Sequence, residues 1–486
     1  MDKSRRNRIL LIGLTTLFFI LLNVMTLHVG HDWGDDFAQY IMYARNLLSG
    51  RHLTDGVLLG ADYLFLYPPG YSFLLAPILW FRGLDFMAFK FLNILLWMGT
   101  AWGCYRLFLH LDKKPVWVVP LMLAVSAQFF FYKQTVSPDF LLTCLSVWAI
   151  YSFEKYISSR RRVYFYSFVL MAFGAVFTRS AGLFLYAAAA YYLIVVRRSW
   201  RDVFWLAVSL VLGTGLQYFL VGIGLGAWRG LQGNIFVTLG QIIQHLPILF
   251  KSMVLCLVPW ETGLVTGLYV WLFRVFDHAS VFFLAVVCFV FVRRAWQKRM
   301  TFLDTAFFSY FMMLVIWEGV SGNPPDIFIR YVIPVYPLIL FYLYQWLNKR
   351  SGVLMRVFFM VVFVLNAWTI VCNYNSYIDD IATPPARAVF SWVKANTAPE
   401  DHLMFASPRA MALMTQRAVA PISFGDDRQN LATISRYQIR YIIVLRKDLD
   451  ESLGGMIRLG VKLHPVWEDS VFMVFEVMDA GVSKAR

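Results

Sequence analysis

Residues 28–50 read HVGHDWGDDFAQYIMYARNLLSG, and residues 63–77 read YLFLYPPGYSFLLAP. The first segment follows a long apolar run and interrupts the apolar pattern with two adjacent acids, Asp35 and Asp36. After the acids, apolar residues recur at helical spacing until Ser49-Gly50, so we expect a helix over residues 36–49 that lies in a membrane interface. The two carboxylates then stand at the N-terminus of this helix.

The composition is that of a membrane protein with several spans. Of 486 residues, 59% are hydrophobic and 15% are charged, and the mean hydropathy is +0.60. The formal charge of +15 would also fit a nucleic-acid-binding protein, but the basic residues form short clusters between apolar runs. This distribution follows the positive-inside rule and leaves no basic stripe, so no nucleic-acid partner is expected.

The apolar runs predict about eleven transmembrane helices of roughly 20 residues each. We place them at residues 9–27, 87–109, 115–132, 139–156, 163–178, 181–196, 203–222, 279–293, 303–318, 331–347 and 353–372. A cytoplasmic N-terminus puts the basic clusters inside and the loops 28–86 and 223–278 outside. Gly, Pro and charge interrupt the second loop, which favours interfacial helices, while a re-entrant segment or an extra pair of spans stays open.

The composition changes at the end of the last apolar run. Asn, Asp, Pro and Lys appear, and no later run reaches spanning length. We therefore expect a transmembrane domain over 1–372 and a small soluble α/β domain over 373–486. Strands are predicted at 402–407, 441–446 and 471–477, and helices at 386–396 and 448–459. An odd number of spans places this domain on the extracytoplasmic side.

The acid pair has a structural and a functional interpretation. One Asp at a helix N-terminus caps the helix and favours its positive dipole end, which contributes on the order of 0.5–2 kcal/mol. Two adjacent carboxylates repel each other, however, and Trp33-Gly34 precedes them, where the glycine lets a ligand approach the backbone. We favour a functional pair, with Asp35 and Asp36 as candidate catalytic residues.

Asp139 is a third candidate catalytic acid. It follows Ser137-Pro138 at the predicted outer end of the fourth span, an ordinary helix start. Its predicted position on the same face as Asp35, near membrane depth, favours function over mere capping.

Four further residues are candidates for substrate binding. Tyr67 opens a Tyr-Pro-Pro-Gly-Tyr turn, which either redirects the chain or lines a sugar or lipid site. Arg179 and Arg330 lie near predicted outer span ends, where snorkelling is the simpler explanation for each alone. Tyr331 follows Arg330 in an Arg-Tyr-x-x-Pro-x-x-Pro element.

Neither a metal site nor a disulfide framework is predicted. The histidines of the predicted outer loops lack partners at a recognised ligand spacing. The five cysteines lie in or beside apolar runs and read as buried thiols. No cofactor is therefore predicted, and the pattern does not decide whether a divalent cation takes part.

Together these features resemble GT-C membrane glycosyltransferases. The shared elements are a first-loop acid pair opening an interfacial helix, a Pro-Pro turn, a second-loop acid and the late Arg-Tyr element. Bacterial protein O-mannosyltransferase-like enzymes and the aminoarabinose transferases of lipid A are similar in pattern. The aminoarabinose transferases carry a Lys before the Pro of the turn where this chain has Tyr67, which argues against assuming aminoarabinose as the sugar.

The resemblance implies an enzyme of a bacterial inner membrane. Such enzymes move a sugar, with inversion, from a polyprenyl-phosphate donor to a hydroxyl of a lipid, glycan or protein acceptor on the periplasmic face. Asp35 matches the first-loop catalytic acid, Asp36 its neighbour, and Asp139 the second-loop acid. A transporter or flippase for a lipid-linked substrate and a non-catalytic scaffold are the alternatives; matching broken helices in paired halves, which many transporters show, are not evident in the sequence.

Overall fold

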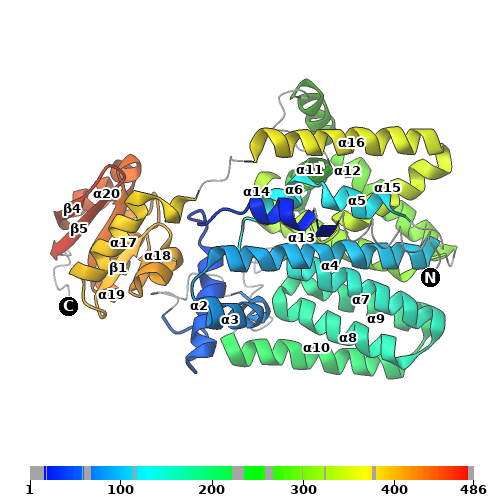
Figure 1. Cartoon of the computed structure of the whole chain (residues 1–486), viewed down its shortest axis with the longest axis horizontal. Coiled ribbons are helices and arrows are strands. Elements are labelled where there is room, and N and C mark those ends of the chain that lie inside the picture. Colours follow the sequence, from blue (N-terminus) through cyan, green and yellow to red (C-terminus); the bar gives the residue numbers. More distant parts are fainter. Residues whose placement is uncertain are drawn as a thin grey trace. The chain divides into compact units, whose positions relative to one another are not determined.

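The computed structural model describes residues 16–17, 19–56, 59, 67–112, 116–221, 235–257, 266–297, 299–321, 325–374 and 379–479. The chain forms two compact units, each built from two segments (Figure 1). One unit comprises Met1–Leu27 and Lys90–Tyr377, and we call it the helical unit. The other comprises His28–Phe89 and Ile378–Arg486, and we call it the α/β unit.

Long apolar helices build the helical unit. They are α4 (Phe86–Asp112, which begins in the α/β unit), α5 (Val118–Ala124), α6 (Ala127–Tyr132), α7 (Asp139–Ser159), α8 (Arg162–Thr178), η2 (Ser180–Gly182), α9 (Leu183–Tyr191), η3 (Tyr192–Arg197), α10 (Trp200–Val221), α11 (Ile235–Leu257), α12 (Thr266–Trp296), α13 (Phe302–Ser321), α14 (Pro325–Val332), α15 (Tyr336–Arg350) and α16 (Gly352–Asn373). Helix α7 packs on α8, α8 on α10, and α13 on both α9 and α11.

Five stretches of the described residues are helical, long and apolar enough to cross a membrane. These are Ser180–Arg197, Trp200–Val221, Gly240–Leu257, Ala279–Trp296 and Gly352–Asn373. Two shorter apolar helical stretches, Arg162–Thr178 and Phe302–Trp317, accompany them. The chain is thus a multi-pass membrane protein, whereas the count of eleven spans stays a prediction.

Most predicted spans coincide with one helix, and two coincide with broken helices. The span expected at 115–132 is divided into α5 and α6, because Ser126 starts a new helix by accepting a hydrogen bond from the Phe129 backbone N–H. The span expected at 331–347 is divided between α14 and α15, with the break at 333–335 around Pro334. Of the predicted span 9–27, residues 16–17 and 19–25 are helical, whereas residues 9–15 lie outside the described residues.

The long loop predicted at 223–278 contains a substantial helix. Helix α11 has 23 residues, and its second part is apolar and long enough to span a membrane. It packs against α12, α13 and α14 of the same unit. A helix of membrane-spanning length is thus present in this loop. It is compatible with each of the three arrangements considered for the loop, namely interfacial helices, a re-entrant segment or additional spans.

The α/β unit contains a mixed sheet. Its strands are β1 (His402–Phe405), β2 (Ala418–Pro421), β3 (Ile439–Leu445), β4 (Lys462–Glu468) and β5 (Phe472–Asp479). Over the described residues their order is β2-β1-β3-β5-β4. The first three strands are parallel, whereas β5 runs antiparallel to both β3 and β4.

Helices before and between the strands complete this unit. They are α2 (Asp36–Leu48), α3 (Gly70–Arg82), η5 (Asp380–Ala382), α17 (Pro384–Asn396), α18 (Pro408–Thr415), α19 (Asp427–Tyr437), η6 (Arg446–Asp448) and α20 (Leu449–Arg458). The predicted helices at 36–49 and 386–396 and the predicted strands at the positions of β1, β3 and β5 are confirmed. Strands β2 and β4 were not predicted; each contains a proline, and β2 has only four residues.

The two faces of the sheet have different partners. Met404 of β1 packs with Ile434 of α19 and Met456 of α20. The neighbouring Phe405 points to the opposite face, because side chains alternate along a strand. There its ring lies 5.2 Å from the ring of Trp33, a residue of the first-loop stretch.

The first-loop stretch is therefore part of this unit's core. The Trp33 ring also lies 5.8 Å from Phe390 of α17 and 5.9 Å from Phe472 of β5. The Ile381 backbone N–H donates to the His31 carbonyl at 3.0 Å. Gly30 permits this close approach, since a Cβ there would lie 2.5 Å from the Cβ of Ala382. Residues at opposite ends of the sequence thus form one core.

Candidate active site

Asp35 precedes the first residue of α2, but its side chain does not cap that helix. Its Oδ1 accepts a hydrogen bond from the Ala410 backbone N–H at 3.0 Å, in the first turn of α18. Its Oδ2 lies 3.6 Å from Nε of Arg409. The interpretation of this carboxylate as the cap of its own helix is therefore wrong.

Asp36 is held by two other side chains. The Tyr67 hydroxyl donates to Oδ1 of Asp36 at 2.7 Å. The same oxygen lies 3.6 Å from Nη1 of Arg409. The Arg409 guanidinium carbon in turn lies 5.4 Å from the centre of the Tyr67 ring. One arginine thus contacts both acids and the tyrosine that orients one of them.

The fold explains how these four side chains meet. Strand β1 ends at Phe405 and α18 begins at Pro408, so the start of α18 lies at the carboxyl end of β1. Strand β1 lies between β2 and β3, and the chain goes first to β2 and only then to β3 on the other side. Such a switch point is where open α/β sheets bind anionic groups, with the N–H groups of the crossover helix facing the ligand. Here the Asp35 carboxylate occupies that position.

The tyrosine side of the cluster comes from α2 and α3. The ring of Tyr40 stacks on Tyr67 at 5.5 Å and meets Tyr71 edge-on at 5.6 Å. Farther along α2, Arg45 donates to the Leu413 carbonyl of α18 at 3.5 Å. The turn at Tyr67 therefore does more than redirect the chain, since its hydroxyl and ring both contact the charged groups.

Burial dominates the electrostatics of Asp35. Loss of water raises its pKa to about 6, against the opposing effects of the Arg409 charge and of the Ala410 and Arg409 backbone N–H groups. The neighbouring charge of Asp36 acts in the same direction as burial. Burial also raises the pKa of Tyr43, which lies one helical turn from Gln39 and accepts its amide hydrogen bond. Asp35 thus has the proton affinity of a base that works near neutral pH.

A second cluster forms within the helical unit from the other predicted residues. Asp139, in the first turn of α7, is buried and paired with Arg179, which follows the last residue of α8. The Arg179 guanidinium carbon lies 4.7 Å from the Tyr331 ring centre. The Arg330 guanidinium carbon lies 5.1 Å from the same ring, and the Tyr310 hydroxyl donates to the Tyr331 carbonyl at 2.7 Å. Two guanidinium groups therefore lie beside one aromatic ring, and one of them is paired with a buried carboxylate.

The predicted site residues accordingly fall into two groups. Asp35, Asp36 and Tyr67 lie together in the α/β unit. Asp139, Arg179, Arg330 and Tyr331 lie together in the helical unit. Arg409 was not predicted. The strand HLMF followed by Ser-Pro-Arg indicates the start of a crossover helix, but nothing in the sequence indicates that its arginine meets the first loop.

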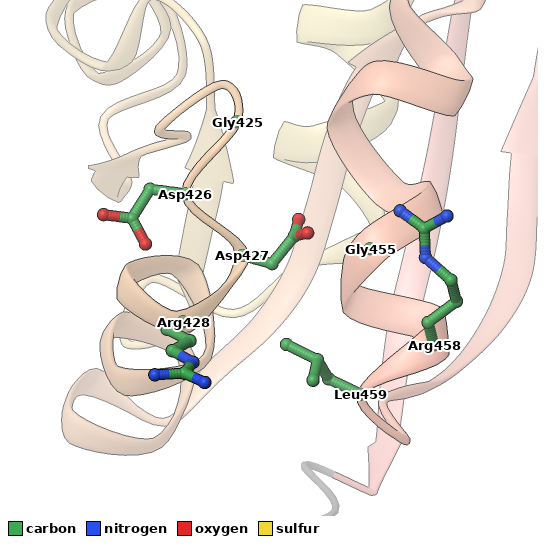
Figure 2. Close-up of a pocket in the computed structure, with 7 residues that line it drawn as sticks. All are labelled: Gly425, Asp426, Asp427, Arg428, Gly455, Arg458 and Leu459. Atoms are coloured by element: carbon green, nitrogen blue, oxygen red, sulfur yellow. The ribbon is translucent and has the colours of Figure 1, made fainter.

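A surface pocket of about 370 Å³ lies elsewhere in the α/β unit (Figure 2). It is lined by Gly425, Asp426, Asp427, Arg428, Gly455, Arg458 and Leu459. Asp427 is directed toward α20, where it packs on Gly455, and Asp426 instead caps α19 through the Gln429 backbone N–H at 3.0 Å. None of these residues is a predicted site residue. Among the described residues no group of three or more His, Cys, Asp or Glu is arranged to hold a metal ion.

The fold and the two clusters define a multi-pass membrane protein with an acid pair in its α/β unit and a cation cluster in its helical unit. A family model described as dolichyl-phosphate-mannose-protein mannosyltransferase matches residues 67–220. The crystal structure of ArnT from Cupriavidus metallidurans in the apo state is similar over 98% of both chains, with a TM-score of 0.50 and 14% identity. The structure of that ArnT bound to undecaprenyl phosphate also aligns over 98% of both chains, with a TM-score of 0.47 and 14% identity.

These findings confirm the resemblance to GT-C membrane glycosyltransferases. At this identity the likeness to ArnT shows the fold. No curated protein matches the chain in sequence.

Proposed function

We propose that this protein is an inverting glycosyltransferase that moves a sugar from a polyprenyl-phosphate donor to a hydroxyl group of an acceptor. The observation that carries the proposal is the state of Asp35, a carboxylate in a GT-C fold whose pKa is raised to about 6. A base of this strength is ionised at neutral pH and still accepts a proton from a hydroxyl that is losing it in the transition state. The family described as using dolichyl-phosphate-mannose supports a lipid-phosphate donor.

In the proposed reaction the acceptor oxygen attacks the anomeric carbon of the sugar. The bond between that carbon and the phosphate oxygen breaks, and the polyprenyl phosphate leaves with the electron pair. The hydroxyl proton passes to the Asp35 carboxylate. Phosphate is a good leaving group, so the reaction needs no strong general acid. Asp36, oriented by the Tyr67 hydroxyl, is assigned to hold the acceptor.

We propose separately that the arginines of the helical unit bind an anionic group. Arg179 is partly neutralised by Asp139, whereas Arg330 adds a second positive charge beside the same Tyr331 ring. A net positive cluster of this kind favours the binding of an anionic group such as a phosphate. Asp139 in this assignment fixes the Arg179 guanidinium and takes no proton.

The test is reconstitution of the protein in lipid vesicles with a panel of polyprenyl-phosphate sugars. We expect the wild type to release free polyprenyl phosphate from one donor and to form a glycosylated acceptor. Removal of the base in Asp35→Asn should lower turnover by about 10²–10⁴-fold, the usual contribution of general base catalysis.

Asp85→Asn is the matched control, because Asp85 is a carboxylate of the same unit that pairs with the exposed Arg82 at 3.2 Å. Its other oxygen accepts from the Ala88 N–H at 3.1 Å, a bond that an Asn side-chain oxygen also accepts. We expect this variant to turn over like the wild type. Equal turnover of Asp35→Asn and the wild type would refute the assignment of the base. Movement of intact donor across the bilayer without release of phosphate would establish a flippase instead.

A further inference from the structure

Arg409 is placed unusually for a cation of a soluble domain. Only 3% of its side chain is exposed, and it lies 3.6 Å from a carboxylate oxygen of each member of the acid pair. A buried charge is stable only where opposite charges and hydrogen bonds replace the water it has lost. The C-terminal segment therefore contributes a cation whose burial depends on two acids of the first loop.

The contact is built from more than one atom of the same helix. Oδ1 of Asp35 accepts from the Ala410 N–H, and Oδ2 faces the Arg409 guanidinium. The carboxylate is thus held by both its oxygens at the N-terminus of α18, where the helix dipole favours a negative charge. Arg45 fastens α2 to the far end of α18 through the Leu413 carbonyl at 3.5 Å. The orientation of Asp35 is therefore set by α18 and not by its own helix.

We propose that Arg409 is a positioning residue of the catalytic site, which keeps the Asp35 and Asp36 carboxylates ionised and oriented side by side. The C-terminal α/β segment is then a component of the active site. This inference rests on the proposed function, in which Asp35 is the base. Because Tyr67 lies over the guanidinium and nearly all of Arg409 is buried, Arg409 acts through the two acids and not by contact with the substrate.

The charged and titratable groups around Asp35 all bear on this inference. Asp36 of α2 and Arg409 of α18 act on Asp35 directly, Tyr67 from the turn before α3 contacts both of these groups, and Tyr43 of α2 interacts with the Arg409 charge. Asp36 opposes ionisation of Asp35, and the Tyr67 hydroxyl donates a hydrogen bond to Asp36. Arg409 is the cation of this set, so its removal should make both carboxylates harder to ionise.

The experiment is the pH dependence of kcat/KM for Arg409→Gln and Arg409→Lys in the reconstituted full-length protein. Loss of a cation close to a carboxylate typically raises the pKa of that carboxylate by about 1–3 units. On the acid side of its pH profile, which we call the acid limb, kcat/KM falls as Asp35 becomes protonated. We expect the midpoint of this acid limb to move to higher pH in Arg409→Gln by about that amount. A move of two pH units would lower kcat/KM at pH 7 by about tenfold. Activity should recover as the pH rises.

Arg409→Lys keeps the charge but cannot span both carboxylates, so we expect its acid limb to move upward by less. A role confined to stability predicts a loss that is the same at every pH, with no displacement of the limb in either variant. That result would overturn the inference. If Arg409→Gln does not fold, the pH profile of Arg409→Lys alone tests the role of Arg409.

Failure of this inference can be distinguished from failure of the proposed function. If Asp35→Asn retains the acid limb, Asp35 is not the base and the proposed function is wrong at this residue. If Asp35→Asn removes the limb but both Arg409 variants leave the wild-type limb in place, the base assignment stands and only the role of Arg409 is wrong.

Discussion

Asp35 lies at the N-terminal ends of two helices, yet its pKa is raised. The N–H groups of α18 and the Arg409 guanidinium favour the carboxylate, while loss of water disfavours it by more. The balance explains why a residue that looks like a cap can act as a base. A capping carboxylate in water would have a low pKa and be a weak base.

This balance predicts the pH dependence of the reaction. With a pKa of about 6, Asp35 is mostly ionised above pH 7 and becomes protonated as the pH falls through 6. We expect kcat/KM to be flat above pH 7 and to fall about tenfold per unit well below pH 6, because only the ionised form accepts the proton. A pH series on the reconstituted enzyme measures this limb. A limb centred near pH 4 would mean that Asp35 is as well hydrated as a surface carboxylate.

The buried pair Asp139–Arg179 makes a different prediction at the residue scale. Removing one member leaves the other charge buried without its partner, which typically costs about 3–5 kcal/mol. We expect Asp139→Asn and Arg179→Gln each to lower the free energy of unfolding by such an amount, and the double variant to lose less than the sum. Thermal unfolding of the four proteins in detergent gives this double-mutant cycle. Additive losses would mean that the two side chains do not interact.

At the scale of elements, the α/β unit follows a general rule of open α/β sheets. The charged groups gather where the strand order reverses beside β1, at the N-terminus of the following helix. In this chain the group bound there is a carboxylate of the same protein. The binding end of the sheet is therefore used to orient a side chain.

Helix α19 offers a test of local stability in this unit. It ends at Gln438, which has a left-handed backbone with φ of 50°. A side chain in that conformation is strained, so we expect Gln438→Gly to stabilise the unit by about 0.5–1 kcal/mol. Native-state hydrogen exchange of the β3 amides measures the effect. Ala432→Gly, on the exposed side of the same helix, is the control and should destabilise by about 1 kcal/mol.

At the scale of the whole molecule, the topology remains a prediction that cysteine labelling can test. We expect a cysteine at Ser435, exposed on α19, to react with a membrane-impermeant thiol reagent added from the periplasmic side. A cysteine at Ser159, exposed at the end of α7, should react only after the membrane is opened, because it adjoins the basic cluster 160–162. Replacing the exposed Cys372 first removes the background. A cysteine at position 435 that reacts only after the membrane is opened would contradict an extracytoplasmic α/β unit.

Much of the helical structure could be predicted from the sequence, because its signals are local. Apolar runs of spanning length, basic clusters between them and the helical spacing after Asp36 each depend on neighbouring residues. The breaks before α6 and before α15 were not predicted, since the apolar composition continues through both. Strand β2 was not predicted because it is only four residues long and ends in Pro421, which is too short for an alternating hydrophobic pattern to be recognised.

The sequence by itself determined that this is a helical membrane protein with an α/β segment, and that Asp35, Asp36 and Asp139 deserve to be tested. Only the tertiary structure decided what holds those acids. Asp35 and Ala410 are separated by 375 positions, and Arg179 reaches Asp139 across 40. Pairing over such separations is set by the packing of whole elements, α18 on α2 and α7 on α8. The residues adjacent to Arg409 in the sequence do not indicate which distant side chains it contacts, and so its role could not be predicted.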